Sequence, residues 1–331
     1  MTNFWESLPK PFFTLAPMED VTDTVFREVV AGMSDPRYLQ VLYTEFASVD
    51  GLNHPVGKLN VGHRLLVSDS ERALLKQKNI RLVVQIWGKN PELFNKIARE
   101  ITESQECDGI DINMGCPVKK VVKNGCCSAL IDQPDLAREI ILATMEGTHL
   151  PVSVKTRTGI RAHETERWME TVLGTKPAAV ILHGRTQKQQ SDGLANWEEI
   201  GKGVQVRNQI SPETVFVGNG DVNSVAQGIE LSQKYGVDGI MVGRGIFHNP
   251  WFFQPDHPVP GKYEKLGHLL FHTKLFEKTW GKEKRINIMK RFFKIYTNDF
   301  TDASKLRVQL MDARSYEEIY RILEEEMKSE K

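Results

Sequence analysis

The chain has 331 residues, of which 40% are hydrophobic and 26% are charged, a composition typical of a globular protein with a sizeable core. Its 43 basic and 43 acidic side chains give a net charge of zero, so overall charge argues neither for nor against a nucleic-acid partner. No apolar run is long enough to span a bilayer, and residues 1–10 lack the apolar stretch of a signal peptide, so we expect a cytoplasmic protein.

Short apolar runs recur along the first three quarters of the chain. They are rich in Val, Ile, Leu and Phe and show little polar alternation, which is the pattern of strands buried on both faces. We predict strands at Phe12–Ala16, Leu39–Tyr43, Leu82–Ile86, Gly109–Asn113, Val152–Lys155, Ala178–Leu182, Val215–Gly218 and Gly239–Val242.

Helical patterns separate these runs. We predict helices at Thr22–Ala31 (capped by its Thr), Pro91–Glu103, Asp135–Met145, His163–Leu173, Trp197–Val206 and Ser224–Tyr235, with another inside Leu59–Lys78. About eight strands, each followed by a helix, predict an α/β fold, the (β/α)8 TIM barrel. The alternative, an open doubly wound sheet, would place a glycine fingerprint after the first strand, but residues 16–20 contain no glycine.

The composition and the hydrophobic pattern of the sequence change after Pro250. The segment Gln254–Gly261 is rich in proline and is typical of a linker, and from Tyr263 onward the pattern is helical only. We therefore predict a barrel domain over residues 1–253 and a small C-terminal helical domain over residues 254–331.

Unusual polar residues or glycine turns close nearly every predicted strand. In chain order they are Pro17-Met18, Glu45, Gln85, Asn113, Lys155, His183, Asn219-Gly220-Asp221 and Gly243-Arg244-Gly245. In this architecture the chemistry lies at the carboxyl ends of the strands. Any one of these residues could simply satisfy nearby backbone groups. Together on one rim, they indicate a single polar cavity.

The loops after the seventh and eighth strands are the usual phosphate site of such a barrel. Glycines there let backbone N–H groups approach phosphate oxygens, and Arg244 adds a positive, bidentate donor, although the glycines could equally serve tight loops. Lys155 at the end of a buried strand needs an anion or an acceptor. Gln85 and Asn113 suit the edge of a heterocycle, and His183 suits either the ring or a phosphate. These residues indicate a phosphorylated heterocyclic cofactor without specifying a flavin.

The cysteines are Cys107, Cys116, Cys126 and Cys127, and they form no C-x-x-C pair or zinc-type cluster. We therefore expect neither a metal site nor a disulfide framework.

Seven motifs carry a resemblance to a known family. They are Ala16-Pro17-Met18 with Val21-Thr22-Asp23 and Phe26-Arg27; Gln85-Ile86-Trp87-Gly88; Asp111 to Pro117; Val154 to Gly159; His183-Gly184-Arg185-Thr186; Gly218 to Val222; and Gly243-Arg244-Gly245 with Asn249-Pro250-Trp251. In order and spacing they resemble the tRNA-dihydrouridine synthases from Phe12 to Phe253, and more weakly in the tail.

The resemblance implies tightly bound FMN, NADPH as the reductant, and tRNA as the substrate. It assigns FMN binding to Ala16, Pro17, Met18, Gln85, Lys155, His183, Asn219, Gly220, Asp221, Gly243 and Arg244. It also implies that NADPH reduces FMN, that hydride then passes from flavin N5 to C6 of uracil, and that Cys116 gives a proton to C5. A thiol suits this role because its ordinary pKa, about 8.5, keeps it protonated yet acidic enough.

Three further residues are candidates for substrate contact. Asn113 could bind the uracil edge, and Arg157 and Arg185 suit tRNA or substrate better than FMN, though each could instead form a solvated salt bridge. The chain departs from the family pattern at Cys126 and Cys127, where small residues or glycine are more usual, at Ser191, where an aromatic is common, and in the tail, where a His beside Lys290-Arg291 is missing.

The span Lys274–Lys294 is strongly basic. It holds eight basic residues, Lys274, Lys278, Lys282, Lys284, Arg285, Lys290, Arg291 and Lys294, against Glu277 and Glu283. Such a patch can neutralise phosphates, so we assign tRNA binding to Lys290 and Arg291, although a solvated face would look alike. The helical spacing of Phe292, Phe293 and Tyr296 favours a place in a helical core over stacking platforms.

Three functions fit this sequence. The first is a tRNA-dihydrouridine synthase, which we expect to be a monomer because RNA must reach the barrel mouth. The second is an FMN barrel oxidoreductase acting on a small pyrimidine or enone, against which the basic tail and the Asn-Met-Gly-Cys-Pro loop argue. The third is a non-catalytic tRNA-binding protein that keeps FMN for structure, against which Cys116 argues.

Overall fold

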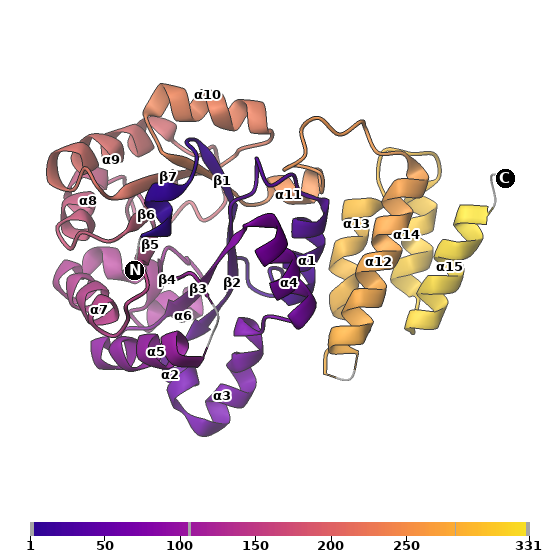
Figure 1. The fold of residues 1–331 in the computed structure, drawn as a ribbon, viewed down its shortest axis with the longest axis horizontal. Helices are drawn as coiled ribbons and strands as arrows, with labels where there is room; N and C mark the ends of the chain where they lie inside the picture. The colour runs from indigo at the N-terminus through magenta and orange to yellow at the C-terminus, as the bar shows by residue number, and fades with distance from the viewer. Residues whose placement is uncertain (1–2, 105–106, 282, 329–331) are drawn as a thin grey trace.

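A computed structural model of the chain describes residues 3–104, 107–281 and 283–328. Eight parallel strands close into one barrel in chain order, and β8 pairs with β1 from Phe12↔Gly239 to Leu15↔Val242 to complete the ring (Figure 1). The strands are β1 (Phe12–Leu15), β2 (Val41–Ser48), β3 (Arg81–Trp87), β4 (Gly109–Met114), β5 (Val152–Arg157), β6 (Ala179–His183), β7 (Val215–Asn219) and β8 (Gly239–Val242). The predicted (β/α)8 barrel is confirmed.

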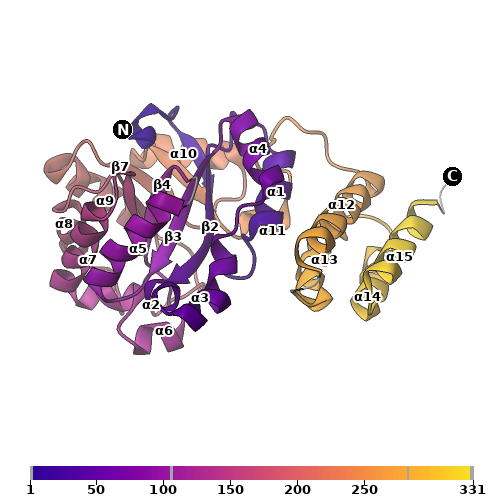
Figure 2. The ribbon, with the colours of Figure 1, turned by 60° about the horizontal axis from the view of Figure 1, so that its bottom comes forward.

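Helices surround the barrel as an outer layer (Figures 1 and 2). They are α1 (Thr24–Met33), α2 (Val49–Asn53), α3 (Pro55–Val61), α4 (Asp69–Lys78), α5 (Pro91–Ser104), α6 (Lys119–Lys123), α7 (Pro134–Glu146), α8 (Thr165–Leu173), α9 (Trp197–Ile210), α10 (Val225–Tyr235) and α11 (Gly245–His248), with the 3₁₀ segments η1 (Phe4–Ser7), η2 (Gly62–Leu65) and η3 (Cys127–Asp132). Side-chain caps explain several starts: Asn196 accepts from Glu198 N and Glu199 N before α9, and Ser224 accepts from Gln227 N before α10.

Three predicted boundaries near the barrel mouth are wrong, and α9 also continues four residues past Val206 to Ile210. The first helix is capped by Asp23 and not by Thr22, because the Asp23 side chain accepts from Phe26 N. Strand β2 continues five residues past Tyr43 through a register shift between Tyr43 and Phe46, so Glu45 lies inside the strand and does not end it. Likewise β5 continues past Lys155 to Arg157.

Two apolar layers explain why the strands show so little alternation. Val41, Tyr43, Val83, Ile181 and Val217 form a cluster with Phe12 and Met241, to which Trp5 of η1 also belongs. The opposite strand faces pack under the helices in a larger cluster. Both faces of each strand are therefore covered, as parallel barrels require.

Five helical segments follow the barrel: α12 (Lys262–Trp280), η4 (Ile286–Phe292), α13 (Phe293–Tyr296), α14 (Ala303–Asp312) and α15 (Tyr316–Lys328). They form a bundle beside α1, joined to the barrel by the stretch that follows α11 (Figures 1 and 2). Phe292 stacks on Phe26 of α1 with ring centroids 5.2 Å apart. Phe292, Phe293 and Tyr296 are buried, which confirms their predicted place in the core. Within the described ranges, no helix combines the length and the hydropathy needed to span a membrane.

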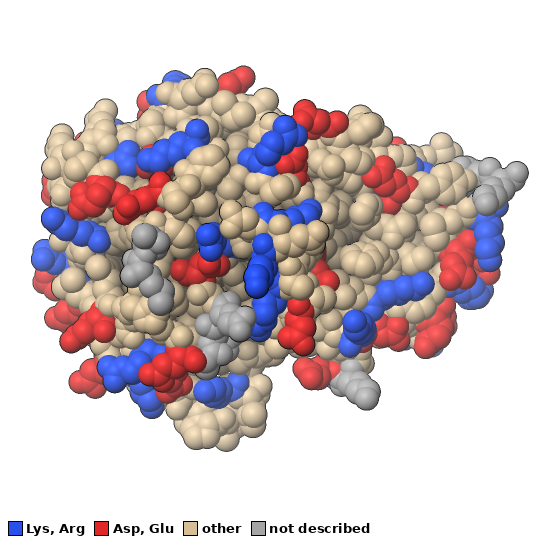
Figure 3. Space-filling model, viewed as in Figure 1, with Lys and Arg blue, Asp and Glu red and all other residues tan. Residues whose placement is uncertain are grey.

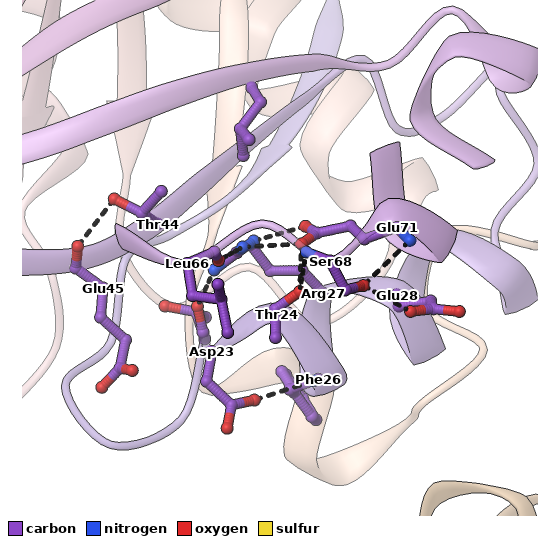
Figure 4. Close-up of polar contacts among 12 residues, drawn as sticks. Asp23, Thr24, Phe26, Arg27, Glu28, Thr44, Glu45, Leu66, Ser68 and Glu71 are labelled. Atoms are coloured by element: carbon purple, nitrogen blue, oxygen red, sulfur yellow. Dashed lines mark hydrogen bonds and ion pairs between the residues drawn. The ribbon is translucent and has the colours of Figure 1, made fainter. Parts of the chain in front are cut away.

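A buried ion pair fixes the β1–α1 loop beside the barrel mouth (Figure 4). Arg27 of α1 binds both carboxylate oxygens of Glu71 of α4 at 2.6 and 2.8 Å, and its other donor reaches Thr22 O at 2.7 Å. Neither side chain of the pair is exposed to solvent. Because the guanidinium also holds a loop carbonyl, the loop that carries Pro17 and Met18 is anchored to the helical layer.

Candidate active site

A cavity of about 470 Å³ lies at the carboxyl ends of the strands. Arg157 and Arg185 line its wall. Nine of the eleven predicted cofactor residues also line it, namely Pro17, Met18, Lys155, His183, Asn219, Gly220, Asp221, Gly243 and Arg244. The volume lies within the range of small-molecule sites. Ala16 and Gln85 are buried and do not belong to this wall.

Strand register explains why these side chains meet. Asn113 pairs with Lys155, Arg157 with His183, and His183 with Asn219, so neighbouring strands present one polar ring at the same height. Residues two apart on a strand share a face, so Ser153, Lys155 and Arg157 point to the same side of β5. This polar ring lies on the solvent side of the apolar residues that fill the barrel interior. A ligand can therefore reach the ring from solvent.

Lys155 is a cation that lines the cavity, and its hydrogen-bond partner among the described residues is a neutral amide. Its Nζ donates to Asn219 Oδ1 at 3.2 Å, and the Asn219 amide is itself held by Met241 O at 2.9 Å. Burial, followed by the nearby Arg157, lowers the pKa of Lys155 to about 8. Asp111 and Cys116 act in the opposite direction without cancelling the shift, so an anionic ligand would further stabilise the charged lysine.

His183 lies in the same cationic surroundings. Burial pushes its pKa well below the ordinary value, and the charges of Arg157, Lys155, Arg185 and Arg244 act in the same direction. The imidazole is therefore neutral at physiological pH; its Nε2 accepts from Arg185 Nη1 at 3.3 Å, which leaves Nδ1–H as the donor.

The two arginines predicted to face substrate are occupied within the protein. Arg157 donates from Nε to Gly115 O at 2.7 Å and from Nη1 to Gln190 O at 2.8 Å. Arg185 donates to both Asp221 oxygens at 2.6 and 2.8 Å and to Gly193 O at 2.6 Å. Both side chains are buried, and both tie the loop after β6 to its neighbours. Their geometry is that of residues that shape the cavity wall.

The loops after β7 and β8 leave an open cradle. Gly220 has φ +136°, and a Cβ there would lie 2.4 Å from the Ala195 Cβ, so glycine is required. Asp221 also has a positive φ of 51°. Arg244 is exposed on the other loop, and its Nη2 lies 3.5 Å from Asp221 Oδ1. A phosphate could approach these backbone N–H groups with Arg244 at its side.

The opposite side of the mouth holds a connected polar network. Ser153 Oγ and Gln85 Nε2 donate to Asp111 at 2.6 Å each, and Asn113 Nδ2 donates to Gln85 Oε1 at 3.0 Å. Asn113 Oδ1 then accepts from Gly115 N at 3.1 Å and Cys116 N at 2.9 Å. Burial raises the pKa of Asp111 to about 7. The network shapes the loop that carries Cys116.

Asp111 and Ser153 were not predicted as site residues. The register pairs Gln85 with Asp111 and Asp111 with Ser153, so three strands bring these side chains together. A polar residue in the middle of an otherwise apolar strand, two positions before Asn113, was the signal in the sequence that could have revealed Asp111.

Cys116 is half-buried on the loop after β4. Its pKa is lowered to about 7, first by a hydrogen bond from the Cys127 thiol and further by the Val118 backbone N–H and the charge of Arg157, while burial opposes the shift. All four cysteines are free thiols. Among the described residues, no group of three His, Cys, Asp or Glu side chains is arranged to hold a metal ion.

Comparison with known proteins adds to this geometry. A family model described as "Dihydrouridine synthase (Dus)" matches residues 14–331. The chain is 42% identical over 325 residues to a "Probable tRNA-dihydrouridine synthase" of Staphylococcus aureus (strain COL), covering 98% of this chain and 95% of that one. It is 41% identical over 325 residues to "Probable tRNA-dihydrouridine synthase 2" of Bacillus subtilis (strain 168), covering 98% and 96%. The chain belongs to the dihydrouridine synthase family.

A solved structure supports the fold alone. The chain resembles 6-hydroxypseudooxynicotine amine oxidase from Pseudomonas geniculata N1 with a TM-score of 0.54 and 11% identity, over 74% of this chain and 46% of that one. Dihydrouridine synthases are oxidoreductases, and the polar ring of this barrel lies where such chemistry takes place in the architecture.

In this dihydrouridine synthase, several basic residues of the tail face the protein itself. Lys284 Nζ lies 3.2 Å from Asp23 Oδ2 and 3.9 Å from the centre of the Trp280 ring, and Arg291 Nη1 donates to Asp20 O at 2.6 Å. Lys290 Nζ donates to Met311 O at 2.5 Å. Thus Lys284 and Arg291 join the tail to the β1–α1 loop, close to Pro17 and Met18.

Other basic residues of the span point to solvent. Lys274, Lys278, Arg285 and Lys294 are exposed, and Lys282 lies outside the described residues. On the face shown in Figure 3, acidic and basic side chains are interspersed over the barrel and the tail. A role of the tail in binding RNA therefore depends on local contacts of individual residues such as Arg291.

Proposed function

We propose that the protein reduces a uridine of tRNA to 5,6-dihydrouridine, using FMN as the bound cofactor and NADPH as the source of electrons. The observation that carries this proposal is Lys155, a partly buried cation in the cavity of a dihydrouridine synthase family member, whose ammonium hydrogen-bonds among the described residues to the neutral Asn219 amide. A partly buried charge of this kind favours an anion nearby.

The donor set of the cavity suits FMN. Lys155 would face the part of the flavin ring that becomes negative on reduction, and neutral His183 would offer a donor to the ring or to the phosphate. Gly220, Gly243 and Arg244 would hold the phosphate, with the backbone N–H groups of the two loops and the Arg244 guanidinium as donors. Bound FMN would supply the hydride that adds to C6 of uracil.

Cys116 supplies the proton that completes the reduction at C5. The network from Asp111 through Gln85 and Asn113 holds the Cys116 backbone, which fixes where the thiol can point. A pKa near the working pH suits a general acid, because the thiol form is populated and transfers its proton readily. Asn113 contributes by holding this loop, and its second amide hydrogen is suited to the uracil edge.

The proposal includes tRNA binding by the tail and a monomer as the working form. The tail is joined to the barrel mouth through Lys284 and Arg291, so an RNA bound on exposed tail residues would lie near the cavity. Light scattering coupled to size-exclusion chromatography measures the mass and would reveal a dimer directly.

The deciding experiment follows flavin and product in one preparation. The visible spectrum of the purified protein reports bound FMN, bleaching with NADPH under anaerobic conditions reports its reduction, and unmodified tRNA is then assayed for dihydrouridine. We expect a yellow protein that bleaches and forms dihydrouridine. A yellow protein that turns over free uridine or small enones and leaves tRNA unchanged would favour the small-molecule reductase. A colourless protein that cannot be reconstituted with FMN would overturn the proposal.

A further inference from the structure

A glutamate of β2 is buried against the loop that carries Pro17 and Met18. Glu45 is 1% exposed, and its Oε1 accepts from Asp20 N at 2.6 Å. Its other oxygen, Oε2, is buried and has no hydrogen-bond partner among the described residues. Burying a carboxyl group costs free energy, and an unpaired oxygen adds to that cost. Such a cost persists where the group serves a purpose other than stability.

A β-bulge directs Glu45 to this place. Thr44 and Glu45 both lie opposite Val84 of β3, so β2 carries one extra residue here. The Thr44 hydroxyl stabilises the bulge, because its Oγ1 accepts from Gln85 N at 3.2 Å and donates to Glu45 O at 2.7 Å (Figure 4). Bulges next to active sites commonly redirect a side chain, and this one brings the Glu45 carboxyl to the β1–α1 loop.

The loop beside Glu45 forms a compact turn that begins at Met18. Met18 O accepts from Val21 N at 3.2 Å and from Thr22 N at 3.0 Å, and Thr22 Oγ1 accepts from Met18 N at 2.9 Å. Asp20 lies inside this turn with φ +56°, in the left-handed region that disfavours residues other than glycine. The hydrogen bond from Asp20 N to Glu45 stabilises this disfavoured conformation.

The helical tail contacts the same turn from outside. Arg291 Nη1 donates to Asp20 O at 2.6 Å, and Lys284 Nζ lies 3.2 Å from Asp23 Oδ2. Burial raises the pKa of Glu45 to about 7, and the charge of Lys284 opposes this rise. The turn is therefore held by a barrel strand on one side and by the tail on the other.

We infer that Glu45 is a positioning residue, whose hydrogen bond from Asp20 N holds the turn of residues 18–22 in the conformation that places Pro17 and Met18 on the wall of the cofactor cavity. The inference rests on the proposed function, since it takes FMN as the ligand of that cavity. Pro17 and Met18 line the cavity, and Glu45 does not. Glu45 thus acts on the cofactor through the turn.

The test compares Glu45→Met, Glu45→Gln and Glu213→Met in the full-length protein. Methionine has a similar volume and removes the acceptor, and an apolar side chain suits a buried site. Glutamine keeps an oxygen acceptor for Asp20 N and removes the charge that interacts with Lys284. Glu213 is exposed just before β7, at the end of the barrel opposite the cavity, and serves as the matched control.

The first measurement is amide hydrogen exchange of the peptide that spans residues 18–23, in protein without FMN. Exchange there should be about threefold to tenfold faster in Glu45→Met, as loss of one hydrogen bond predicts, while α7 exchanges as in the wild type. Glu45→Gln and Glu213→Met should match the wild type in both places. Unchanged exchange of the turn in Glu45→Met, an equal rise in α7, or a turn that exchanges as fast in Glu45→Gln would overturn the inference.

The second measurement is fluorescence titration of the apoproteins with FMN. Without the bond to Glu45, the left-handed conformation of Asp20 becomes a minor state that FMN has to restore. The Kd should therefore rise about threefold to tenfold in Glu45→Met and stay that of the wild type in Glu45→Gln and Glu213→Met. A wild-type Kd in Glu45→Met would overturn the link from the turn to the cofactor. A wild type that binds no FMN would defeat the proposed function, whereas the exchange rates would still show whether Glu45 holds the turn.

Discussion

The two halves of the barrel mouth differ in how their polar side chains are satisfied. On the β3–β4 side, Asp111, Gln85 and Asn113 bind one another and the Cys116 loop in a closed chain of hydrogen bonds. On the β5–β8 side, Arg157 and Arg185 are paired within the protein, but among the described residues the Lys155 ammonium hydrogen-bonds to a neutral amide and Arg244 reaches its acid at 3.5 Å. One half is complete within the protein, whereas the other leaves positive charge to be matched.

This difference separates two tasks. A network that is satisfied within the protein can hold a reacting group in place before substrate arrives, because its geometry does not depend on the ligand. On the side with unmatched cations, binding of an anion stabilises the charged side chains. These side chains therefore determine the affinity for the cofactor. Substitutions on the first side should therefore lower turnover and spare the flavin, and those on the second should release the flavin first.

The largest effect is expected at Cys116. Cys116→Ala removes the proton donor and should lower kcat for dihydrouridine formation by about 100-fold to 10,000-fold, the usual contribution of a general acid. The ratio of flavin to protein should stay that of the wild type. Cys107→Ala, just before β4, is the control and should keep full activity. Normal turnover by Cys116→Ala would remove the chemical role assigned to the β3–β4 side.

The next effect concerns flavin retention. Lys155→Met keeps much of the side-chain volume and removes the charge, so FMN affinity should fall about 10-fold to 100-fold, as loss of one charge-assisted hydrogen bond predicts. Fluorescence titration of the apoprotein with FMN measures the affinity. Lys305→Met, at an exposed lysine of α14 paired with Asp302, should bind FMN normally. A wild-type affinity in Lys155→Met would show that the cofactor does not depend on the cationic side.

The pH dependence of FMN binding provides a second test of the role of the Lys155 charge. The pKa of Lys155 in the free protein is about 8, so above that pH binding of FMN is accompanied by uptake of a proton from solvent. Binding of the anion favours the charged lysine and raises its pKa, so affinity should be close to its maximum at about pH 7, roughly halved at about pH 8 and about tenfold lower at about pH 9. Lys155→Met should show no such fall. A pH-independent wild type would mean that FMN binding does not change the protonation of Lys155.

Sequence could predict the barrel because each strand is apolar on both faces and each helix is bounded by local capping residues. It could also predict which residues lie on the rim, because the carboxyl ends of all strands lie at the same end of a barrel, independently of the loop conformations. Predictions failed where tertiary contacts decide, as at β2, whose bulge carries Glu45 into the strand. The bulge depends on pairing with β3, where Gln85 N donates to Thr44 Oγ1, and no local pattern encodes that contact.

The same limit of sequence-based prediction applies to the two arginines of the site. A strand-end arginine can face solvent, substrate or a loop, and only the loop conformation tells which carbonyls lie within reach. Arg157 is occupied by Gly115 O and Gln190 O, which are 42 and 33 residues away along the chain. Cys127 likewise adopts a left-handed backbone conformation, which sequence rules would assign to glycine.

The smallest effect is expected where the tail meets the mouth, outside both halves. Arg291 is exposed and donates to Asp20 O, so it can join the domains or contact a phosphate. If it contacts tRNA, Arg291→Ala should weaken binding severalfold and reduce the slope of log K against log salt by about one. Lys234→Ala, at an exposed lysine of α10, is the control and should leave the slope unchanged. An unchanged slope in Arg291→Ala, with a lower unfolding midpoint, would assign Arg291 to domain docking and place the RNA contacts on other residues.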